Sequence, residues 1–180
     1  SQLWMAMTML DSSRAKSVLA KKTNVNVDQV SNMIIWGNHS PTMYPDIENA
    51  VVNGESISSV INDMGWVENE FLPTVQQRGK AVIDARGASS ATSAAKAALD
   101  TVIACENPTD SNDSFSAAVE SDGSYGVPEG LICGFPLSTD GNGVVTIKKG
   151  LDLSDFAKQK FQVSIDELIS ERQAVEHLMK

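Results

Sequence analysis

The sequence lacks the features that mark several large classes of protein. Only two of its 180 residues are cysteines, Cys105 and Cys133, and neither belongs to a Cys-x-x-Cys pair or to another spacing typical of a metal site. We therefore expect no bound metal and two ordinary small thiols in a reducing compartment. No apolar run reaches the roughly 18 residues that a membrane-spanning helix requires, so the sequence predicts no membrane span.

Positive charge is also scarce. The chain has 14 lysines and arginines against 23 aspartates and glutamates, which gives a formal net charge of -9. Because such a surface repels phosphate backbones and anionic lipid headgroups, we expect neither nucleic acid nor a membrane as a partner. An acidic protein that binds an acidic substrate must concentrate its positive charge locally, so a single well-placed arginine is of particular interest.

The beginning of the chain lacks two further signals. It opens at Ser1 without an initiator methionine and without the basic segment of a signal peptide, a start that is typical of a fragment. No Gly-x-Gly-x-x-Gly follows a predicted strand, so the sequence predicts no dinucleotide-binding domain within this chain. Hydrophobic residues make up 42% of the chain, which is enough for the core of one domain or of two very small ones.

The pattern of apolar residues predicts an α+β fold. Helical spacing predicts helices over residues 11–22, 56–64, 71–85 and 89–105. Short apolar runs predict strands over residues 33–36, 114–120, 131–135 and 144–148. Because turns rich in glycine join the last three strands, we expect an antiparallel meander. The whole is predicted to be helices packed on a twisted, largely antiparallel sheet.

The end of the chain is predicted to be a long amphipathic helix. Ser164-Ile165-Asp166-Glu167 has the pattern of a capping box, which predicts that the helix begins there and runs to the C-terminus. Its predicted buried stripe consists of Leu168, Ile169, Val175 and Leu178.

Three polar residues are placed where they could act together. Asp11 and Arg14 are three positions apart on a predicted helix, so they share one face, and His39 lies in a loop directly after a predicted strand. A helix followed by a returning strand could bring His39 beside Asp11. An aspartate that accepts a hydrogen bond from an imidazole favours its protonated form, and an arginine binds a carboxylate with two parallel hydrogen bonds. Together these residues could hold an organic acid and move a proton at its neighbouring oxygen.

Each residue also has a purely structural interpretation. Asp11 and Arg14 could be an exposed helix pair worth about a few tenths of a kcal/mol. His39 could be a loop histidine that is hydrogen-bonded to the backbone. His177, the other histidine, falls on the polar side of the predicted last helix and is interpreted as a surface residue.

Two motifs favour the catalytic interpretation. Leu10-Asp11-Ser12-Ser13-Arg14-Ala15 and Ile35-Trp36-Gly37-Asn38-His39-Ser40 closely resemble the two catalytic motifs of malate dehydrogenases of the cytosolic, chloroplast and related bacterial type. The likeness continues in order through residues 85–97, 124–128 and 134–136, and it covers roughly residues 5–180. The chain departs from the family at Ser12-Ser13, where the family often has His-Asn.

The resemblance implies the C-terminal domain fold of the lactate/malate dehydrogenases and the interconversion of (S)-malate and oxaloacetate with NAD. It implies that His39 donates and accepts the proton, that Asp11 is the carboxylate paired with it, and that Arg14 holds the C1 carboxylate of the substrate. Ser89 and Ser90 match a segment that lines the substrate pocket, and Ser89 is also a candidate for cofactor binding. Both serines could instead cap a helix.

The resemblance further implies that an N-terminal NAD-binding domain, of the order of 150 residues, is absent from this chain. We therefore expect the isolated chain to be inactive and to expose an apolar patch where that half would dock. The resemblance implies a homodimer for the full-length protein. A cytoplasmic location is expected rather than a chloroplast one, because the C-terminus lacks the cysteine-bearing tail of the chloroplast form. Two alternatives remain open: a related 2-hydroxy acid dehydrogenase with aromatic or lactate-like substrates, and a stand-alone, non-catalytic interaction domain.

Overall fold

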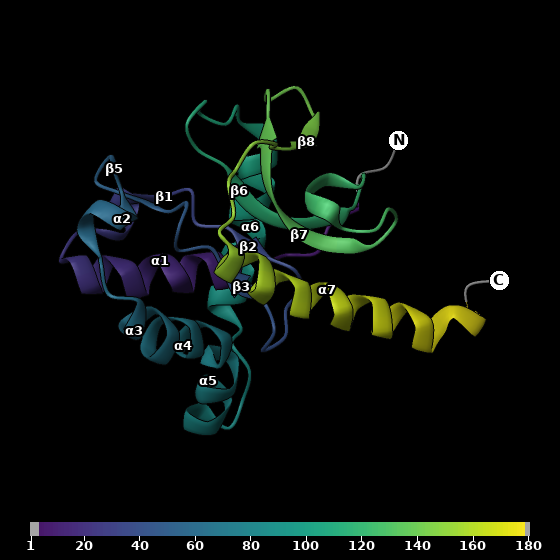
Figure 1. Cartoon of the computed structure of the whole chain (residues 1–180), viewed down its shortest axis with the longest axis horizontal. Helices are drawn as coiled ribbons and strands as arrows, with labels where there is room; N and C mark the ends of the chain where they lie inside the picture. The colour runs from purple at the N-terminus through teal and green to yellow at the C-terminus, as the bar shows by residue number, and fades with distance from the viewer. Residues whose placement is uncertain (1–3, 179–180) are drawn as a thin grey trace.

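The computed structural model describes residues 4–178, so the expectations for Ser1 and for the last two residues of the C-terminal helix lie outside the described part. The helices are α1 (Met9–Thr23), α2 (Ile57–Val60), α3 (Met64–Trp66), α4 (Leu72–Gln76), α5 (Arg78–Arg86), α6 (Thr92–Glu106) and α7 (Asp155–Val175) (Figure 1). The strands are β1 (Val30–Ser31), β2 (Ile35–Trp36), β3 (Tyr44–Pro45), β4 (Val51–Val52), β5 (Glu55–Ser56), β6 (Phe115–Glu120), β7 (Ile132–Thr139) and β8 (Val145–Ile147). Shorter helical segments are η1 (Val27–Gln29), η2 (Val67–Phe71), η3 (Ser124–Gly126) and η4 (Glu176–Leu178).

The structure has no helix, among those described, with the length and apolar character needed to cross a membrane.

Helix α1 confirms the predicted helix over residues 11–22, and charges at both ends favour it. Asp11 lies in the first turn, and Lys21 and Lys22 lie in the last turn, where they complement the helix dipole. Asn24 ends the helix in the left-handed conformation, with φ at 57°. The face of α1 that contains Asp11 is buried, which places this carboxylate inside the protein.

The β-strands form a three-stranded meander, a two-stranded hairpin and a small three-stranded sheet in the order β1-β4-β5. β6 pairs with β7 and β7 pairs with β8, both antiparallel, as the sequence predicts. β2 and β3 form a separate antiparallel pair, with Trp36 opposite Tyr44. A bridge between Gly37 and Gly134 connects this hairpin to β7. The loop between β2 and β3, which contains His39, is therefore anchored to the larger sheet.

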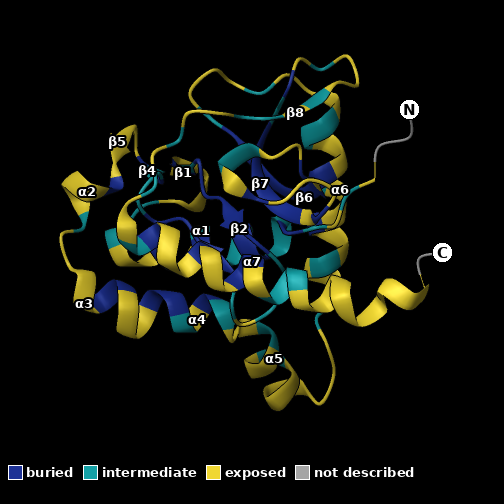
Figure 2. Cartoon of the chain, turned by 45° about the vertical axis from the view of Figure 1, so that its right-hand side comes forward, coloured by how far each residue is buried: buried dark blue, intermediate teal, exposed yellow. Residues whose placement is uncertain are grey.

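The hydrophobic core lies between the strands, α1, α4 and α7. Its largest fully buried side chains include Trp36, Tyr44, Phe71 and Phe135. The ring centroid of Trp36 lies 5.0 Å from that of Phe161 on α7. Figure 2 shows buried residues concentrated in β2, β6 and β7, whereas the outer sides of the helices are exposed. This arrangement confirms the predicted α+β fold.

The segment after β4 differs from the helix predicted over residues 56–64. Asn53 and Gly54 have φ values of 52° and 82°, and they form the tight turn of a hairpin between β4 and β5. Helix α2 is consequently short, and the side chain of Asp63 caps the next helical region. That region begins at Met64, earlier than the sequence predicts, and continues through η2 into α4.

Helix α6 begins at Thr92, with Ala91 at its N-cap position, rather than at residue 89. The alternative interpretation of Ser89 and Ser90 as cap residues of this helix is therefore wrong. Both serines lie in the loop that precedes α6.

Helix α7 begins well before the predicted capping box. Ser154 caps it, because its Oγ accepts a hydrogen bond from the backbone N of Ala157 at 3.1 Å. Ser164 consequently lies inside the helix, where it is completely buried. The prediction that residues 164–167 open the helix is wrong, since the helix already begins at Asp155, and the side chains of Ser164 and Glu167 contact the loop at Asn38 instead of capping it.

The predicted buried stripe of α7 is correct only in its first half. Leu168 and Ile169 are partly buried against the core. Val175 and Leu178, which were predicted to be buried, are 44% and 71% exposed. Figure 1 shows the reason: the C-terminal part of α7 extends away from the body of the domain.

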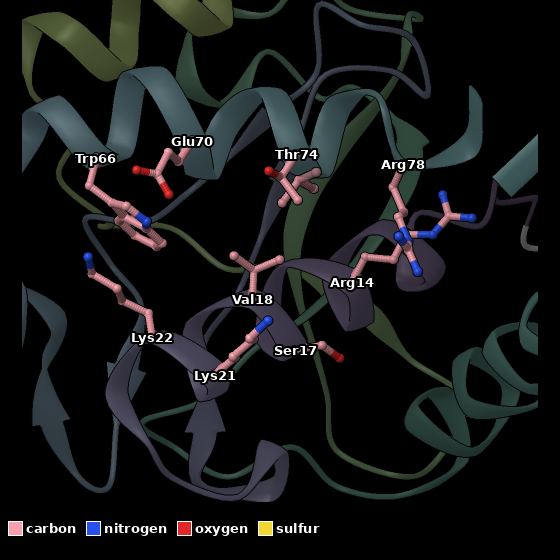
Figure 3. Close-up of a pocket in the computed structure, with 10 residues that line it drawn as sticks. Arg14, Ser17, Val18, Lys21, Lys22, Trp66, Glu70, Thr74 and Arg78 are labelled. Carbon is pink, nitrogen blue, oxygen red and sulfur yellow. The ribbon is translucent and has the colours of Figure 1, made fainter. Parts of the chain in front are cut away.

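A groove with a volume of about 750 Å³ separates α1 from the α3–α4 region (Figure 3). Basic side chains contribute much of its lining, namely Arg14, Lys21, Lys22 and Arg78. The Nζ of Lys22 lies 4.7 Å from the centroid of the Trp66 ring. Because Arg14 lies at one end of this groove, the groove opens beside the site described next.

Candidate active site

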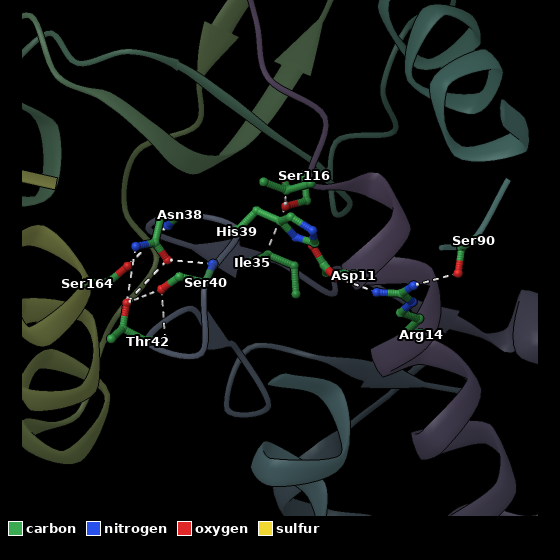
Figure 4. Close-up of polar contacts among 11 residues, drawn as sticks. Asp11, Arg14, Ile35, Asn38, His39, Ser40, Thr42, Ser90, Ser116 and Ser164 are labelled. Carbon is green, nitrogen blue, oxygen red and sulfur yellow. Dashed lines mark hydrogen bonds and ion pairs between the residues drawn. The ribbon is translucent and has the colours of Figure 1, made fainter. Parts of the chain in front are cut away.

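A buried aspartate holds an exposed histidine at the start of α1. The side chain of Asp11 has no solvent exposure, and its Oδ2 lies 2.5 Å from Nδ1 of His39 (Figure 4). The His39 side chain is 63% exposed. Because Nδ1 faces Asp11, the second ring nitrogen, Nε2, is available to a ligand.

Arg14 contacts the other oxygen of the same carboxylate. Its Nη1 lies 3.2 Å from Oδ1 of Asp11, and its Nη2 donates a hydrogen bond to Oγ of Ser90 at 3.3 Å. The Arg14 side chain is only 14% exposed. The structure therefore brings Asp11, Arg14, His39 and Ser90 together. Ser89 is exposed in the same loop, and Ser90 rather than Ser89 contacts Arg14.

The Asp11 carboxylate changes the acidity of the histidine. Its hydrogen bond to His39 is the largest influence and raises the imidazole pKa above the ordinary value, and its negative charge acts in the same direction. Partial burial and the positive charge of Arg14 lower the pKa, but they do not cancel the rise. His39 is therefore a group that holds a proton more firmly than a free imidazole does, beside a guanidinium.

Ser116, which the sequence did not indicate, links the two elements that carry Asp11 and His39. Ser116 Oγ lies 2.9 Å from Oγ1 of Thr8, the N-cap residue of α1, and it accepts a hydrogen bond from the backbone N of Ile35 at 2.9 Å. Ser116 is fully buried in β6. One side chain thus links the helix that carries Asp11 with the strand that leads to His39. Nothing in the spacing of Ser116 along the sequence could indicate this role.

Ser12 makes a second link of the same kind. Its Oγ donates a hydrogen bond to the carbonyl O of Met33 at 2.7 Å. The residue at which the sequence departs from the related motif therefore has a structural role here.

Close backbone approach explains the glycine two residues before the histidine. Gly37 has a φ of 92°, and a Cβ atom on it would lie 1.9 Å from Oγ of Ser164. A larger residue would push the loop away from α7 or change its backbone conformation. Gly37 therefore permits the loop to pass between β7 and α7 before it reaches His39.

The chemistry that this arrangement supports is proton transfer beside an anion-binding group. Arg14 supplies fixed positive charge, His39 supplies a titrating nitrogen at the surface, and Asp11 contacts both and stabilises the charged form of His39. Within residues 4–178 no cluster of three or more histidine, cysteine or acidic side chains could hold a metal ion. Both cysteines are free, with Cys133 buried and Cys105 partly buried.

Comparison with protein families and curated proteins shows that the chain is similar to the C-terminal part of lactate and malate dehydrogenases. Residues 8–179 match the family described as lactate/malate dehydrogenase, alpha/beta C-terminal domain. The chain is 51% identical over 174 residues to the malate dehydrogenase of Magnetococcus marinus, an overlap that covers 97% of this chain and 53% of that protein. This chain thus spans about half the length of that curated relative.

Solved structures show the same partial overlap. The malate dehydrogenase of Naegleria fowleri is similar with a TM-score of 0.89 and 41% identity, over 97% of this chain and 53% of that one. A Trichomonas vaginalis lactate dehydrogenase in complex with NADH and oxamate is similar with a TM-score of 0.88 and 27% identity, over 97% and 55% of the two chains.

Proposed function

Because this chain belongs to the lactate/malate dehydrogenase C-terminal domain family, we propose that it is the substrate-binding and catalytic half of a malate dehydrogenase that interconverts (S)-malate and oxaloacetate with NAD(H). The observation that carries this proposal is the contact of one buried carboxylate with both His39 and Arg14. Because both side chains contact the same carboxylate, the proton-transfer group and the carboxylate-binding group are held next to each other.

In the proposed reaction, Arg14 binds the C1 carboxylate of malate. Its guanidinium has five N–H donors, and the contacts with Asp11 and Ser90 leave donors for a substrate. Neutral His39 takes the proton of the C2 hydroxyl, and Asp11 stabilises the imidazolium that forms. In the reverse direction, protonated His39 returns this proton to the carbonyl oxygen of oxaloacetate.

NAD is the proposed cofactor, and the residues described here fit only one edge of it. Two exposed side chains, those of His39 and Ser89, are the ones that would face the nicotinamide. NAD would supply the acceptor for the hydride that leaves C2 of malate. We propose that a separate N-terminal domain binds the rest of NAD, which agrees with the overlap of about half of each relative.

The relatives favour malate over lactate-like or aromatic substrates. The relatives at 51% and 41% identity are malate dehydrogenases, whereas those near 25% include both malate and lactate dehydrogenases. We further propose that the full-length protein is a cytoplasmic homodimer. Three apolar residues on α6 are exposed in this chain: Leu99, Val102 and Ile103. Their exposure supports an interface with another domain or subunit at this helix.

The test is substitution of the histidine in the full-length protein. His39→Asn is expected to lower kcat by at least about 100-fold, the scale of lost acid–base catalysis, and to leave NADH affinity unchanged. His177→Asn, which changes an exposed histidine at the far end of the chain, is the matched control. Near-normal turnover by His39→Asn would contradict the proposal.

The isolated chain offers a second test. With NADH and oxaloacetate we expect no measurable turnover, because only part of the site is present. Intact mass of the source protein separates this proposal from the stand-alone interaction domain, since a mass near that of this chain alone would favour the latter.

A further inference from the structure

A second carboxylate holds the histidine loop from the opposite side. Glu167 lies on α7, and its Oε2 accepts hydrogen bonds from Nδ2 of Asn38 at 2.9 Å and from Oγ of Ser40 at 2.7 Å. The same Oε2 accepts a further hydrogen bond from Oγ1 of Thr42. All three donors belong to the loop that contains His39, so hydrogen bonds to a single carboxylate oxygen hold this loop against α7.

A neighbouring residue on α7 adds a backbone contact. Ser164 lies one helical turn before Glu167, and its Oγ accepts a hydrogen bond from the backbone N of Asn38 at 3.1 Å. The Asn38 side chain is fixed within the loop as well, because its Oδ1 accepts a hydrogen bond from the backbone N of Ser40 at 3.1 Å. The residues on both sides of His39 are therefore held.

The loop directs alternate side chains to opposite sides. Figure 4 shows Asn38, Ser40 and Thr42 turned toward Ser164 on α7, whereas His39 points the other way, toward Asp11. Fixing the flanking residues therefore fixes the direction of the His39 ring. The hydrogen bond between His39 and Asp11 needs that direction, because the side chain is 63% exposed and Asp11 is its only hydrogen-bond partner among residues 4–178.

We propose that Glu167 is a positioning residue, which orients His39 for proton transfer by holding Asn38 and Ser40 against α7. This inference deepens the function proposed above and rests on it for its kinetic consequence. Glu167 makes its hydrogen bonds to Asn38, Ser40 and Thr42 and none to His39, whose raised pKa is caused mainly by the hydrogen bond to Asp11. The three donors also lower the pKa of Glu167, which keeps it ionised at neutral pH.

The direct test is an NMR titration of the histidine rings in this chain. Glu167→Ala is expected to lower the His39 pKa toward the ordinary value of about 6.5, because a released loop weakens the contact with Asp11. Glu167→Gln keeps a neutral acceptor and is expected to have an intermediate effect. Glu171→Ala is the matched control, since it removes the same charge one turn later on an exposed part of α7. His177 gives an internal reference in every spectrum.

A purely structural role would give a different result. If Glu167→Ala and Glu167→Gln lower the melting temperature but leave the His39 pKa unchanged, the inference is overturned. Should Glu167→Ala fail to fold, Thr42→Val tests the same network with the carboxylate intact, and it is expected to lower the His39 pKa by a smaller amount.

Kinetics of the full-length protein separate this inference from the proposed function. Glu167→Ala is expected to lower kcat by about tenfold or more, as misplacement of a reacting group does, with little change in the KM for oxaloacetate because Arg14 is untouched. A shifted His39 pKa with unchanged kcat would support the positioning role and contradict the proposed function. An unchanged pKa with a reduced kcat would contradict the positioning role alone.

Discussion

The substitution Gly37→Ala tests the packing of the histidine loop against α7. A Cβ atom at this position would lie 1.9 Å from Oγ and 2.5 Å from Cβ of Ser164, and the backbone φ of 92° is one that residues with a side chain rarely adopt. Ser164 is completely buried, so it cannot move aside into solvent. The added methyl group is therefore destabilising for two separate reasons, backbone strain and a steric clash with Ser164.

The two costs can be estimated separately. Left-handed backbone in a residue with a side chain costs about 1–2 kcal/mol, and insertion of an extra carbon into a packed site costs typically about 1–3 kcal/mol. Gly37→Ala is therefore expected to lower the free energy of unfolding by about 2–5 kcal/mol. Gly54→Ala is the control, because Gly54 has a φ of 82° but nothing within 4 Å of the added Cβ. It should show only the backbone cost, about 1–2 kcal/mol.

Urea unfolding of this chain at constant pH measures both values. The variant Ser164→Gly removes the atoms that the new methyl group would meet, so in a double-mutant cycle with Gly37→Ala it should recover about 1–3 kcal/mol. Equal destabilisation by Gly37→Ala and Gly54→Ala, together with an additive cycle, would refute the close contact between the loop and α7.

Two further predictions concern buried and titrating groups. His39 has a raised pKa in the folded chain, so its contribution to stability is complete below the unfolded pKa of about 6.5 and is lost as the pH rises through the folded pKa. Urea unfolding should therefore show that the stability difference between the native chain and His39→Asn shrinks with rising pH. A difference that is independent of pH would contradict this. Trp36 Nε1 donates a hydrogen bond to Oδ2 of the fully buried Asp46 at 2.8 Å, and the same oxygen also accepts one from Nδ2 of Asn49. Trp36→Phe should therefore destabilise the chain by about 2–4 kcal/mol, because a buried carboxylate loses one of its hydrogen bonds and the core loses volume. Trp4→Phe, at a position 73% exposed, should change stability by about 0.5 kcal/mol or less, and equal effects of the two substitutions would count against the Trp36–Asp46 contact.

Contacts between residues close in sequence were the ones that the sequence could predict. Asp11 and Arg14 share a helix face because of their spacing, and a helix followed by a returning strand brings His39 within reach. The antiparallel meander followed from short apolar runs separated by glycine turns. In each case a local rule and a short connection restrict the possible geometry.

Contacts between distant segments could not be predicted in this way. Ser164 and Glu167 have the pattern of a capping box, but their side chains bind a loop that lies more than a hundred residues earlier. A serine and a glutamate three positions apart have the same spacing whether they cap a helix or contact another element from within one. Ser116 likewise has no local signal, because its role depends on β6 passing close to both Thr8, at the start of α1, and Ile35 in β2.

The exposure of the three polar residues distinguishes a site from an ordinary ion pair. A structural pair on a surface tends to expose both partners, as Lys80 and Asp84 do at 75% and 60%. Here the side-chain exposure rises from 0% at Asp11 to 14% at Arg14 and 63% at His39. Burial of the carboxylate makes its two hydrogen bonds strong and directional, and exposure of the imidazole leaves its second nitrogen in reach of a ligand. Since a carboxylate buried only for stability would gain more from partners that are buried with it, the asymmetry is best explained by a histidine that must meet a molecule from outside this domain.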